Sequence, residues 1–181
     1  GDEEVVALRR GGDLHDLGKI TVPDEILKKG ADLTPEEWDI MKQHPITGET
    51  ICRPLKSLRT VLPIILYHHE HWDGSGYPAG LKGEAIPLSA RIMIICDQYD
   101  ALRSKRPYKV ALPHDRVVEI LTVGDGRTMP SHFDPDMLLA FKRCADRFRE
   151  IFESISDQTP HFLAQLRPGG ERKHGGVFGL G

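Results

Sequence analysis

The residues that could do chemistry begin with the stretch HDLGKI, residues 15–20, which places a lysine three residues after a His-Asp pair. Imidazole and carboxylate groups bind many divalent metals, and a lysine ammonium can contact a phosphoryl oxygen. More potential ligands follow at His44, at the adjacent pair His68 and His69, and at Asp97, which stands after the apolar run IMIIC. Together these side chains predict a metal site with nitrogen and oxygen ligands.

Each of these residues alone has a simpler interpretation. A single His such as His44 is more often a packed or surface residue than a ligand, and Asp97 could be held by a buried salt bridge. The joint pattern is more informative, because neighbouring residues on a helix point about 100° apart. The pairs His15–Asp16 and His68–His69 therefore suit two ions bridged by Asp16. A two-metal site of this kind favours phosphodiester hydrolysis.

Composition limits the class of protein. The chain has 181 residues, 39% of them hydrophobic, with no apolar run long enough to span a bilayer and no secretory signal at its start, which favours a cytoplasmic protein. The net charge of −3 lacks the basic excess that polymeric nucleic acid attracts, so an anionic substrate needs a local cationic cluster. Three cysteines without CxxC spacing predict reduced, mostly packed thiols.

The elements that must position these residues are all predicted to be helices. Apolar residues recur at helical spacing over residues 33–44, 57–70, 87–102, 113–121 and 134–152, and no strand pattern is convincing, so the fold class is all-α. Thr34 and Glu37 form a capping box, and Trp38, Ile40 and Met41 then supply the packing surface of their helix. Pro63 starts or kinks the helix that ends in the His pair.

Two glycine-containing segments predict local disorder. Gly11 and Gly12 lie in the helix that leads to His15, where each costs about 1 kcal/mol relative to Ala, so this helix is expected to be frayed or kinked. Six glycines lie within residues 167–181. We expect one helical domain over residues 1–155, followed over residues 156–181 by a short helix and a Gly-rich tail without fixed structure.

Several motifs in order closely resemble the HD-GYP family, the helical metal-dependent phosphodiesterases of bacterial cyclic di-GMP signalling. The resemblance extends from about Leu14 to Phe141 and is carried by HDLGKI, VPDEIL, LTPEEWDIMKQHP, YHHEHWDGSGYPAGLKGEAIPLSARIMIICDQYDAL and RPYK. It implies an HD-domain-like helical bundle with an inward-facing metal site. The implied activity is hydrolysis of cyclic di-GMP to pGpG, GMP or both, with two or three divalent ions, iron or manganese.

The resemblance also implies roles for individual residues. The implied metal ligands are His15, Asp16, His44, His68, His69 and Asp97, with Asp16 and Lys19 as the catalytic residues. Substrate contacts are implied for Lys19, for Tyr77 in the GYP motif, for Asp100 near the metals, and for Arg106 and Lys109 on the phosphates. Without the family, the segment RSKRPYK also fits a plain solvated turn.

Partners and alternatives follow from the same family. Its members normally carry another ligating His upstream of the HD pair, so we expect a helical domain that is incomplete at its N-terminus and has lost a sensory or receiver domain. The GYP loop could bind a diguanylate cyclase domain. Two other functions remain open: a cyclic di-GMP receptor or interaction module without hydrolysis, and a phosphohydrolase of the wider HD superfamily acting on a mononucleotide or alarmone.

Overall fold

The computed structural model describes residues 1–29, 32–105 and 110–156, and all regular secondary structure in these ranges is helical. The predicted all-α class is therefore confirmed. The chain divides into two compact units, residues 1–145 and 146–181. The predicted metal ligands all fall in the first unit, whereas Arg106, Lys109 and the expected tail from residue 157 onward lie outside the described residues.

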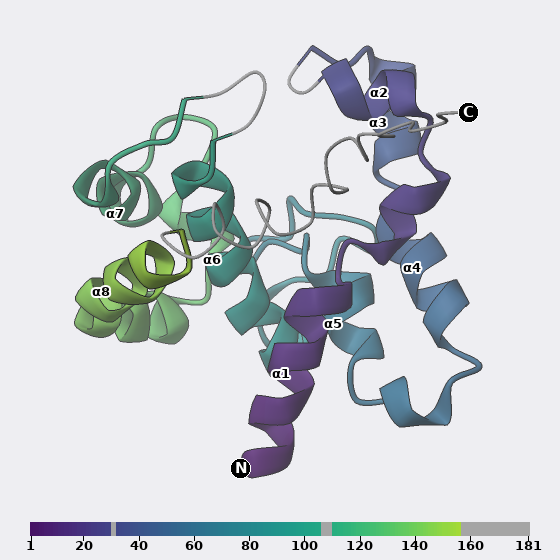
Figure 1. Ribbon diagram of the computed structural model, residues 1–181, viewed down its shortest axis with the longest axis horizontal. Helices are drawn as coiled ribbons and strands as arrows, with labels where there is room; N and C mark the ends of the chain where they lie inside the picture. The colour runs from purple at the N-terminus through teal and green to yellow at the C-terminus, as the bar shows by residue number, and fades with distance from the viewer. Residues whose placement is uncertain (30–31, 106–109, 157–181) are drawn as a thin grey trace, which may run out of the picture. The chain divides into compact units, whose positions relative to one another are not determined.

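Figure 1 shows how the helices are arranged. The α-helices are α1 (Asp2–Leu14), α2 (Asp24–Lys29), α3 (Pro35–Met41), α4 (His44–Cys52), α5 (Leu62–Tyr67), α6 (Leu88–Arg103), α7 (His114–Val123) and α8 (Pro135–Ser156). Four 3-10 helices lie between them: η1 (Leu17–Thr21), η2 (Lys56–Leu58), η3 (Gly83–Ala85) and η4 (Pro130–His132). The expected helix that contains Asp97 corresponds to α6, whereas the helix expected over residues 57–70 is shorter: α5 ends at Tyr67, directly before the His pair.

The segment from Thr34 to Cys52 forms two helices where one was predicted. The capping box of Thr34 and Glu37 is present and starts α3, but α3 ends at Met41, and α4 begins at His44. Pro45 is tolerated in α4 because it lies in the first turn, where its missing N–H has no helical partner. The sequence analysis missed α4, since its Pro, Gly and β-branched residues are weak helix formers.

Helix α1 is continuous through Gly11 and Gly12, so the prediction that it is frayed was wrong. Gly11 is buried, and a Cβ built on it would lie 2.5 Å from Cδ1 of Ile64 in α5. The absence of a side chain therefore lets α1 and α5 approach closely. Helices α1, α5 and α6 lie side by side in Figure 1.

A second close approach joins η1 to the start of α4. A Cβ on Gly18 would lie 1.9 Å from the carbonyl oxygen of His44, and a Cβ on Gly48 would lie 3.1 Å from the backbone nitrogen of Gly18. Only a glycine backbone fits at Gly18. This contact brings Asp16, directly before η1, next to His44.

The buried core of the first unit includes residues from α4, α5 and α6. Cys52, Val61 and Ile65 form one buried cluster, and Met93 and Ile94, in the apolar run before Asp97, are also buried. Other expectations about packing were wrong. Trp38 and Ile40, expected to supply the packing surface of their helix, are 45% and 44% exposed because α3 is short and lies at the surface.

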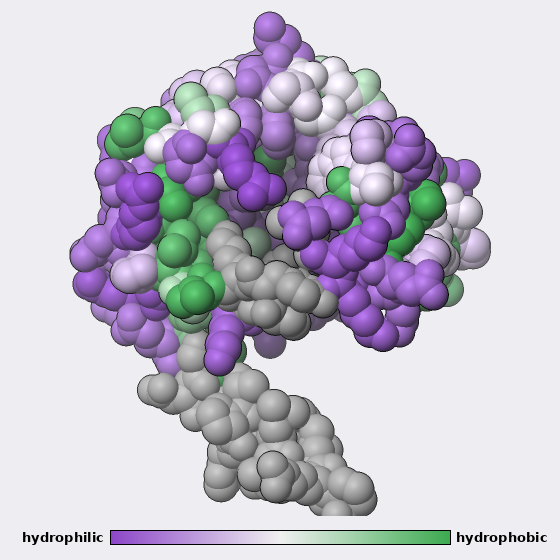
Figure 2. Space-filling model, turned by 90° about the horizontal axis from the view of Figure 1, so that it is seen from above, coloured by the Kyte–Doolittle hydropathy of each residue, from purple (hydrophilic) through white to green (hydrophobic). Residues whose placement is uncertain are grey.

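Hydrophilic residues cover most of the face drawn in Figure 2, with hydrophobic residues gathered in separate patches. Within the described ranges, no helix combines the length and the apolar content that crossing a membrane requires.

Candidate metal centre

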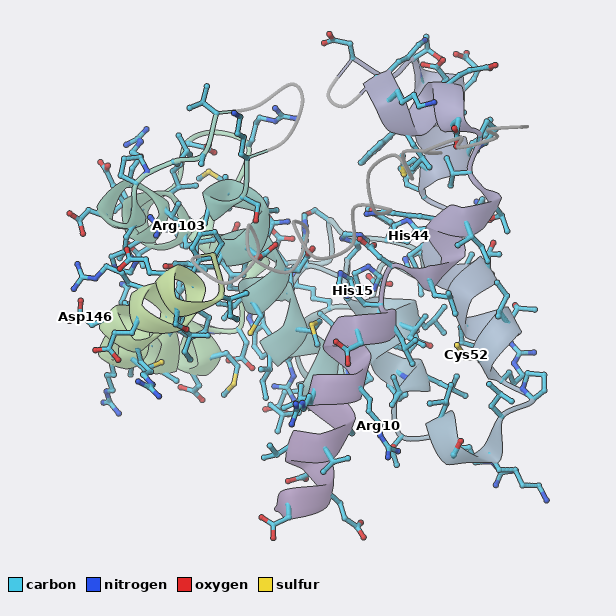
Figure 3. All side chains as sticks on the ribbon, viewed as in Figure 1. Arg10, His15, His44, Cys52, Arg103 and Asp146 are labelled. Carbon is cyan, nitrogen blue, oxygen red and sulfur yellow. The ribbon has the colours of Figure 1, made fainter. Side chains whose placement is uncertain are left out.

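The first unit brings a group of imidazoles and carboxylates together from the ends of its helices. One ligand atom from each of Asp16, His44, His68 and His69 lies within 4.8 Å of the others. His15, at the end of α1, and Asp97, in α6, adjoin this group: His15 Nε2 lies 3.6 Å from Oδ2 of Asp16 and 3.6 Å from Oδ1 of Asp97. His15 and His44 lie near each other in Figure 3. The six predicted ligands are thus neighbours in space.

The backbone orients three of the imidazoles in the same way. Nδ1 of His15 lies 2.7 Å from the carbonyl oxygen of Gly12, Nδ1 of His44 lies 2.8 Å from that of Met41, and Nδ1 of His68 lies 2.9 Å from that of Ile65. A carbonyl oxygen only accepts, so each Nδ1 carries the proton and donates. The lone pair is therefore on Nε2 of each ring, which is the atom that faces the cluster.

The two oxygens of Asp16 have different neighbours. Oδ1 lies 3.3 Å from Nε2 of His44 and 3.8 Å from Nε2 of His68, whereas Oδ2 accepts a hydrogen bond from Nζ of Lys19 at 2.6 Å. Oδ1 is buried and has no hydrogen-bond partner in the described structure. A buried carboxylate oxygen without a donor is costly, so Oδ1 needs a cation.

The Nε2 atoms of His44 and His68 also fit a cation. They are 3.3 Å apart in rings that are almost fully buried, and both carry a lone pair when Nδ1 is protonated. Two lone pairs and a carboxylate oxygen at these distances repel one another unless a positive charge lies among them. The donor set of imidazole and carboxylate is one that divalent transition metals accept.

Burial sets the protonation of these groups. Burial, and then the neighbouring His15 and His44, lowers the pKa of His68 to about 4, and burial holds the pKa of His69 well below its ordinary value. Burial alone would raise the pKa of Asp16, but His44 and Lys19 lower that pKa by more, to well below its ordinary value. At neutral pH these ligands have the neutral imidazole and ionised carboxylate forms that metals bind.

The pKa of His15 is shifted in the opposite direction to those of His68 and His69. Burial lowers its pKa, but the hydrogen bond to Asp97 and the charge of Asp16 outweigh burial, so the pKa of His15 lies above its ordinary value. The position of Asp97 beside Nε2 of His15, at 3.6 Å, favours the charged form of this imidazole. The expected buried carboxylate in α6 therefore has a partner, and the same pair is also available to an ion.

The loop after α5 continues the site with aromatic rings. Tyr77 stacks on His69 with ring centroids 4.8 Å apart, and its backbone N–H donates to the carbonyl oxygen of His69 at 3.1 Å. The ring of Trp38 in α3 meets Tyr77 edge to face, with centroids 6.1 Å apart. Tyr77 thus lies beside His69, a predicted metal ligand.

Glu70 holds this loop and was missed by the sequence analysis. Its carboxylate is almost fully buried and accepts hydrogen bonds from the backbone N–H groups of Ala79 at 2.6 Å and Leu81 at 2.9 Å. A usable signal was present in the sequence: an acidic residue between the His pair and a loop whose N–H groups need acceptors.

Two further predicted site residues, Lys19 and Asp100, lie in the described chain. The side chain of Lys19 is 32% exposed beside Asp16, so its ammonium can reach a bound substrate. Asp100 lies one turn beyond Asp97 in α6, is exposed, and accepts a hydrogen bond from Ser104 at 3.3 Å. None of the contacts described above places Asp100 in the cluster.

Comparisons with known proteins identify the family of this chain. A family model described as HD domain matches residues 2–137. A cyclic di-GMP phosphodiesterase of Vibrio cholerae is 43% identical over 157 residues, which cover 83% of this chain and 31% of that protein. The cyclic di-GMP phosphodiesterase response regulator RpfG of Xanthomonas campestris is 42% identical over 173 residues, which cover 93% of this chain and 42% of that protein.

One solved structure shares the fold. An HDG"Y"P protein from Bdellovibrio bacteriovorus superposes with a TM-score of 0.58 at 22% identity, covering 81% of this chain and 43% of that chain. The chain belongs to the HD domain family, and its resemblance to the HD-GYP proteins is confirmed. Membership implies divalent metal binding, for which the His/Asp cluster supplies ligands. The chain spans about a third of the length of the Vibrio relative and less than half of RpfG.

Proposed function

We propose that this domain hydrolyses a phosphodiester bond of cyclic di-GMP with the help of divalent metal ions. The observation that carries the proposal is the convergence of the Nε2 atoms of three histidines on the two oxygens of Asp16, one of which is buried without a hydrogen bond. Relatives that carry the name cyclic di-GMP phosphodiesterase support the choice of substrate.

The ligands divide into two sets that share Asp16. His44, His68 and His69 together with Asp16 would hold one ion, and His15 and Asp97 together with Asp16 would hold the other. Iron and manganese both suit this mixture of imidazole and carboxylate. Bound divalent ions supply Lewis acidity toward a phosphoryl oxygen and a water nucleophile near neutral pH.

The chain's own residues then hold and orient the substrate. Lys19 releases part of its contact with Asp16 and donates to a phosphoryl oxygen, where it balances the negative charge that develops. Tyr77, fixed by its stacking on His69, closes one side of the site. Asp100, Arg106 and Lys109 remain proposed substrate contacts. Water adds to phosphorus, the bond from phosphorus to a ribose oxygen breaks, and the product is the linear dinucleotide pGpG, with GMP after a second cleavage.

The test is turnover by the purified chain loaded anaerobically with Mn(II) or Fe(II). Cyclic di-GMP is incubated with the loaded protein and the nucleotides are separated by chromatography over time, beside a cyclic dinucleotide with one adenine and a mononucleotide. We expect metal-dependent pGpG or GMP. Asp16→Asn should lose both bound metal and product, because Asp16 contacts both ligand sets.

The opposite results are equally informative. Cyclic di-GMP that binds to the folded, metal-loaded chain but remains intact would make the domain a receptor. Cleavage of the mononucleotide in preference to the dinucleotide would assign it to another branch of HD phosphohydrolases. Full turnover by Asp16→Asn without bound metal would contradict the metal-dependent mechanism.

A further inference from the structure

Trp38 is a large aromatic side chain that remains exposed close to the metal centre. Its residue is 45% exposed, although an indole is usually well buried in a folded domain. Exposure alone does not indicate a ligand, because Ile40 in the same helix is 44% exposed. What distinguishes Trp38 is its position next to Tyr77.

Three rings form a row that ends at a candidate metal ligand. The ring of Trp38 meets that of Tyr77 at 6.1 Å and an interplanar angle of 74°, and Tyr77 stacks on His69 at 4.8 Å and 26°. Edge-to-face and offset-stacked pairs at these distances are favourable, so each ring helps to fix the next. The indole is therefore two ring contacts away from His69.

This spacing matches the layout of a nucleotide. A phosphodiester held at the metal centre lies one ribose away from its base, so the base can extend from His69 toward Tyr77 and Trp38. Bases bind proteins by stacking on exposed aromatic side chains, which is sequence-tolerant because every base has a π-face. An exposed indole held beside Tyr77 offers such a surface without any buried polar group to satisfy.

We propose that Trp38 stacks on one purine base of the dinucleotide and so forms a base-binding subsite of the centre. The inference rests on the proposed function, because it requires a cyclic dinucleotide as substrate. Trp38 contributes affinity that is equal in the ground state and the transition state, since the base is remote from the reacting phosphorus. It binds guanine and adenine alike, so it does not choose between the two bases.

The test compares Trp38→Ala, Trp38→Phe and Ile40→Ala in the metal-loaded chain. Removal of a base-stacking residue costs about 1–3 kcal/mol per base, which corresponds to a rise in KM of about 5- to 150-fold. We expect that rise for Trp38→Ala with kcat changed by less than about 3-fold, which is the signature of lost uniform binding. Trp38→Phe should have a KM close to that of the wild type. Ile40→Ala is the matched control, equally exposed in the same helix, and should keep the wild-type KM.

A binding measurement completes the test without relying on turnover. The chain contains two tryptophans, so cyclic di-GMP should quench part of the indole fluorescence of the wild type, and Trp38→Phe should lose that part while still binding. A wild-type KM in Trp38→Ala, or quenching that persists in Trp38→Phe, would overturn the inference even if the domain is an active phosphodiesterase. If the wild type neither binds nor cleaves cyclic di-GMP, the proposed function fails first and the subsite with it.

Discussion

At the scale of single residues, Asp16 organises the centre because its two oxygens have different surroundings. Oδ1 is buried between His44 and His68, whereas Oδ2 lies by His15 and holds the ammonium of Lys19. One carboxylate therefore belongs to both ligand sets. Lys19 is the cation that this arrangement places beside the ligands, which makes it the residue to test for charge stabilisation.

Replacing Lys19 by Met should lower kcat by about 10²-fold, the usual effect of removing one preorganised donor to a developing negative charge. Metal content should stay near that of the wild type, because the ligands themselves are intact. The control is Lys28→Met, which removes an exposed lysine that is paired with Asp24 at 2.9 Å. Steady-state kinetics and metal analysis on both variants check this. Equal kcat values in the two variants would remove Lys19 from the mechanism.

At the scale of elements, the centre depends on how closely short helices approach one another. Gly11 lies one turn before His15 in α1, and Ile64 lies one turn before His68 at the end of α5. Their close contact brings the rings of His15 and His68 to 5.0 Å. Gly18 likewise lets η1 and α4 approach closely, and this contact places Asp16 next to His44.

Two adjacent glycines in α1 give a matched pair of substitutions. Gly12→Ala should raise the free energy of unfolding by about 0.5–1 kcal/mol, because helical Gly is entropically unfavourable and the nearest atom to a new Cβ is Met93 Cε at 3.9 Å. Gly11→Ala should lower it by about 1–3 kcal/mol, because the new methyl overlaps Ile64. Urea unfolding of both variants measures the difference. An unchanged or higher free energy of unfolding in Gly11→Ala would mean that α1 and α5 are not in close contact at Gly11.

At the scale of the whole molecule, the metal centre links several helices, so metal binding should stabilise the first unit. An ion that binds the folded chain at 100 times its Kd adds about 2.7 kcal/mol to the free energy of unfolding. We expect the unfolding midpoint to rise with Mn(II) and to fall again with a chelator. His44→Ala should respond far less, because it removes one imidazole of the closest group. A wild-type response in this variant would place the stabilising ion elsewhere.

The metal-free protein should also lose stability in mild acid. Burial, and then His132, lowers the pKa of His71 to about 4 in the folded chain, against 6.5 for an unperturbed His. Between pH 6.5 and 4 the unfolded chain therefore binds more protons at His71, so the free energy of unfolding falls as the pH falls, by at most about 1.4 kcal/mol per pH unit for one group.

His68 acts in the same direction, whereas His15, whose pKa is raised, acts in the opposite direction. The comparison is therefore made between the wild type and His71→Asn. Unfolding in the presence of a chelator should show a smaller loss of stability between pH 7 and pH 5 in the variant. An identical loss in both proteins would mean that His71 is protonated as readily in the folded chain as in the unfolded chain.

The sequence by itself determined the features that depend on local interactions. The helical class, the capping box at Thr34 and the start of α5 near Pro63 follow from side-chain type and short-range spacing. The resemblance to a family added the expected chemistry, because its motifs extend over most of the described chain.

Only the tertiary structure decided how these residues meet. The division at Met41 and His44, the exposure of Trp38 and Asp100, and the role of Glu70 in holding the loop arise from contacts between distant segments. Gly11 and Gly18 illustrate the physical reason. Local propensity predicts that a glycine destabilises a helix, but where two backbones come into contact, the missing side chain is what allows the contact.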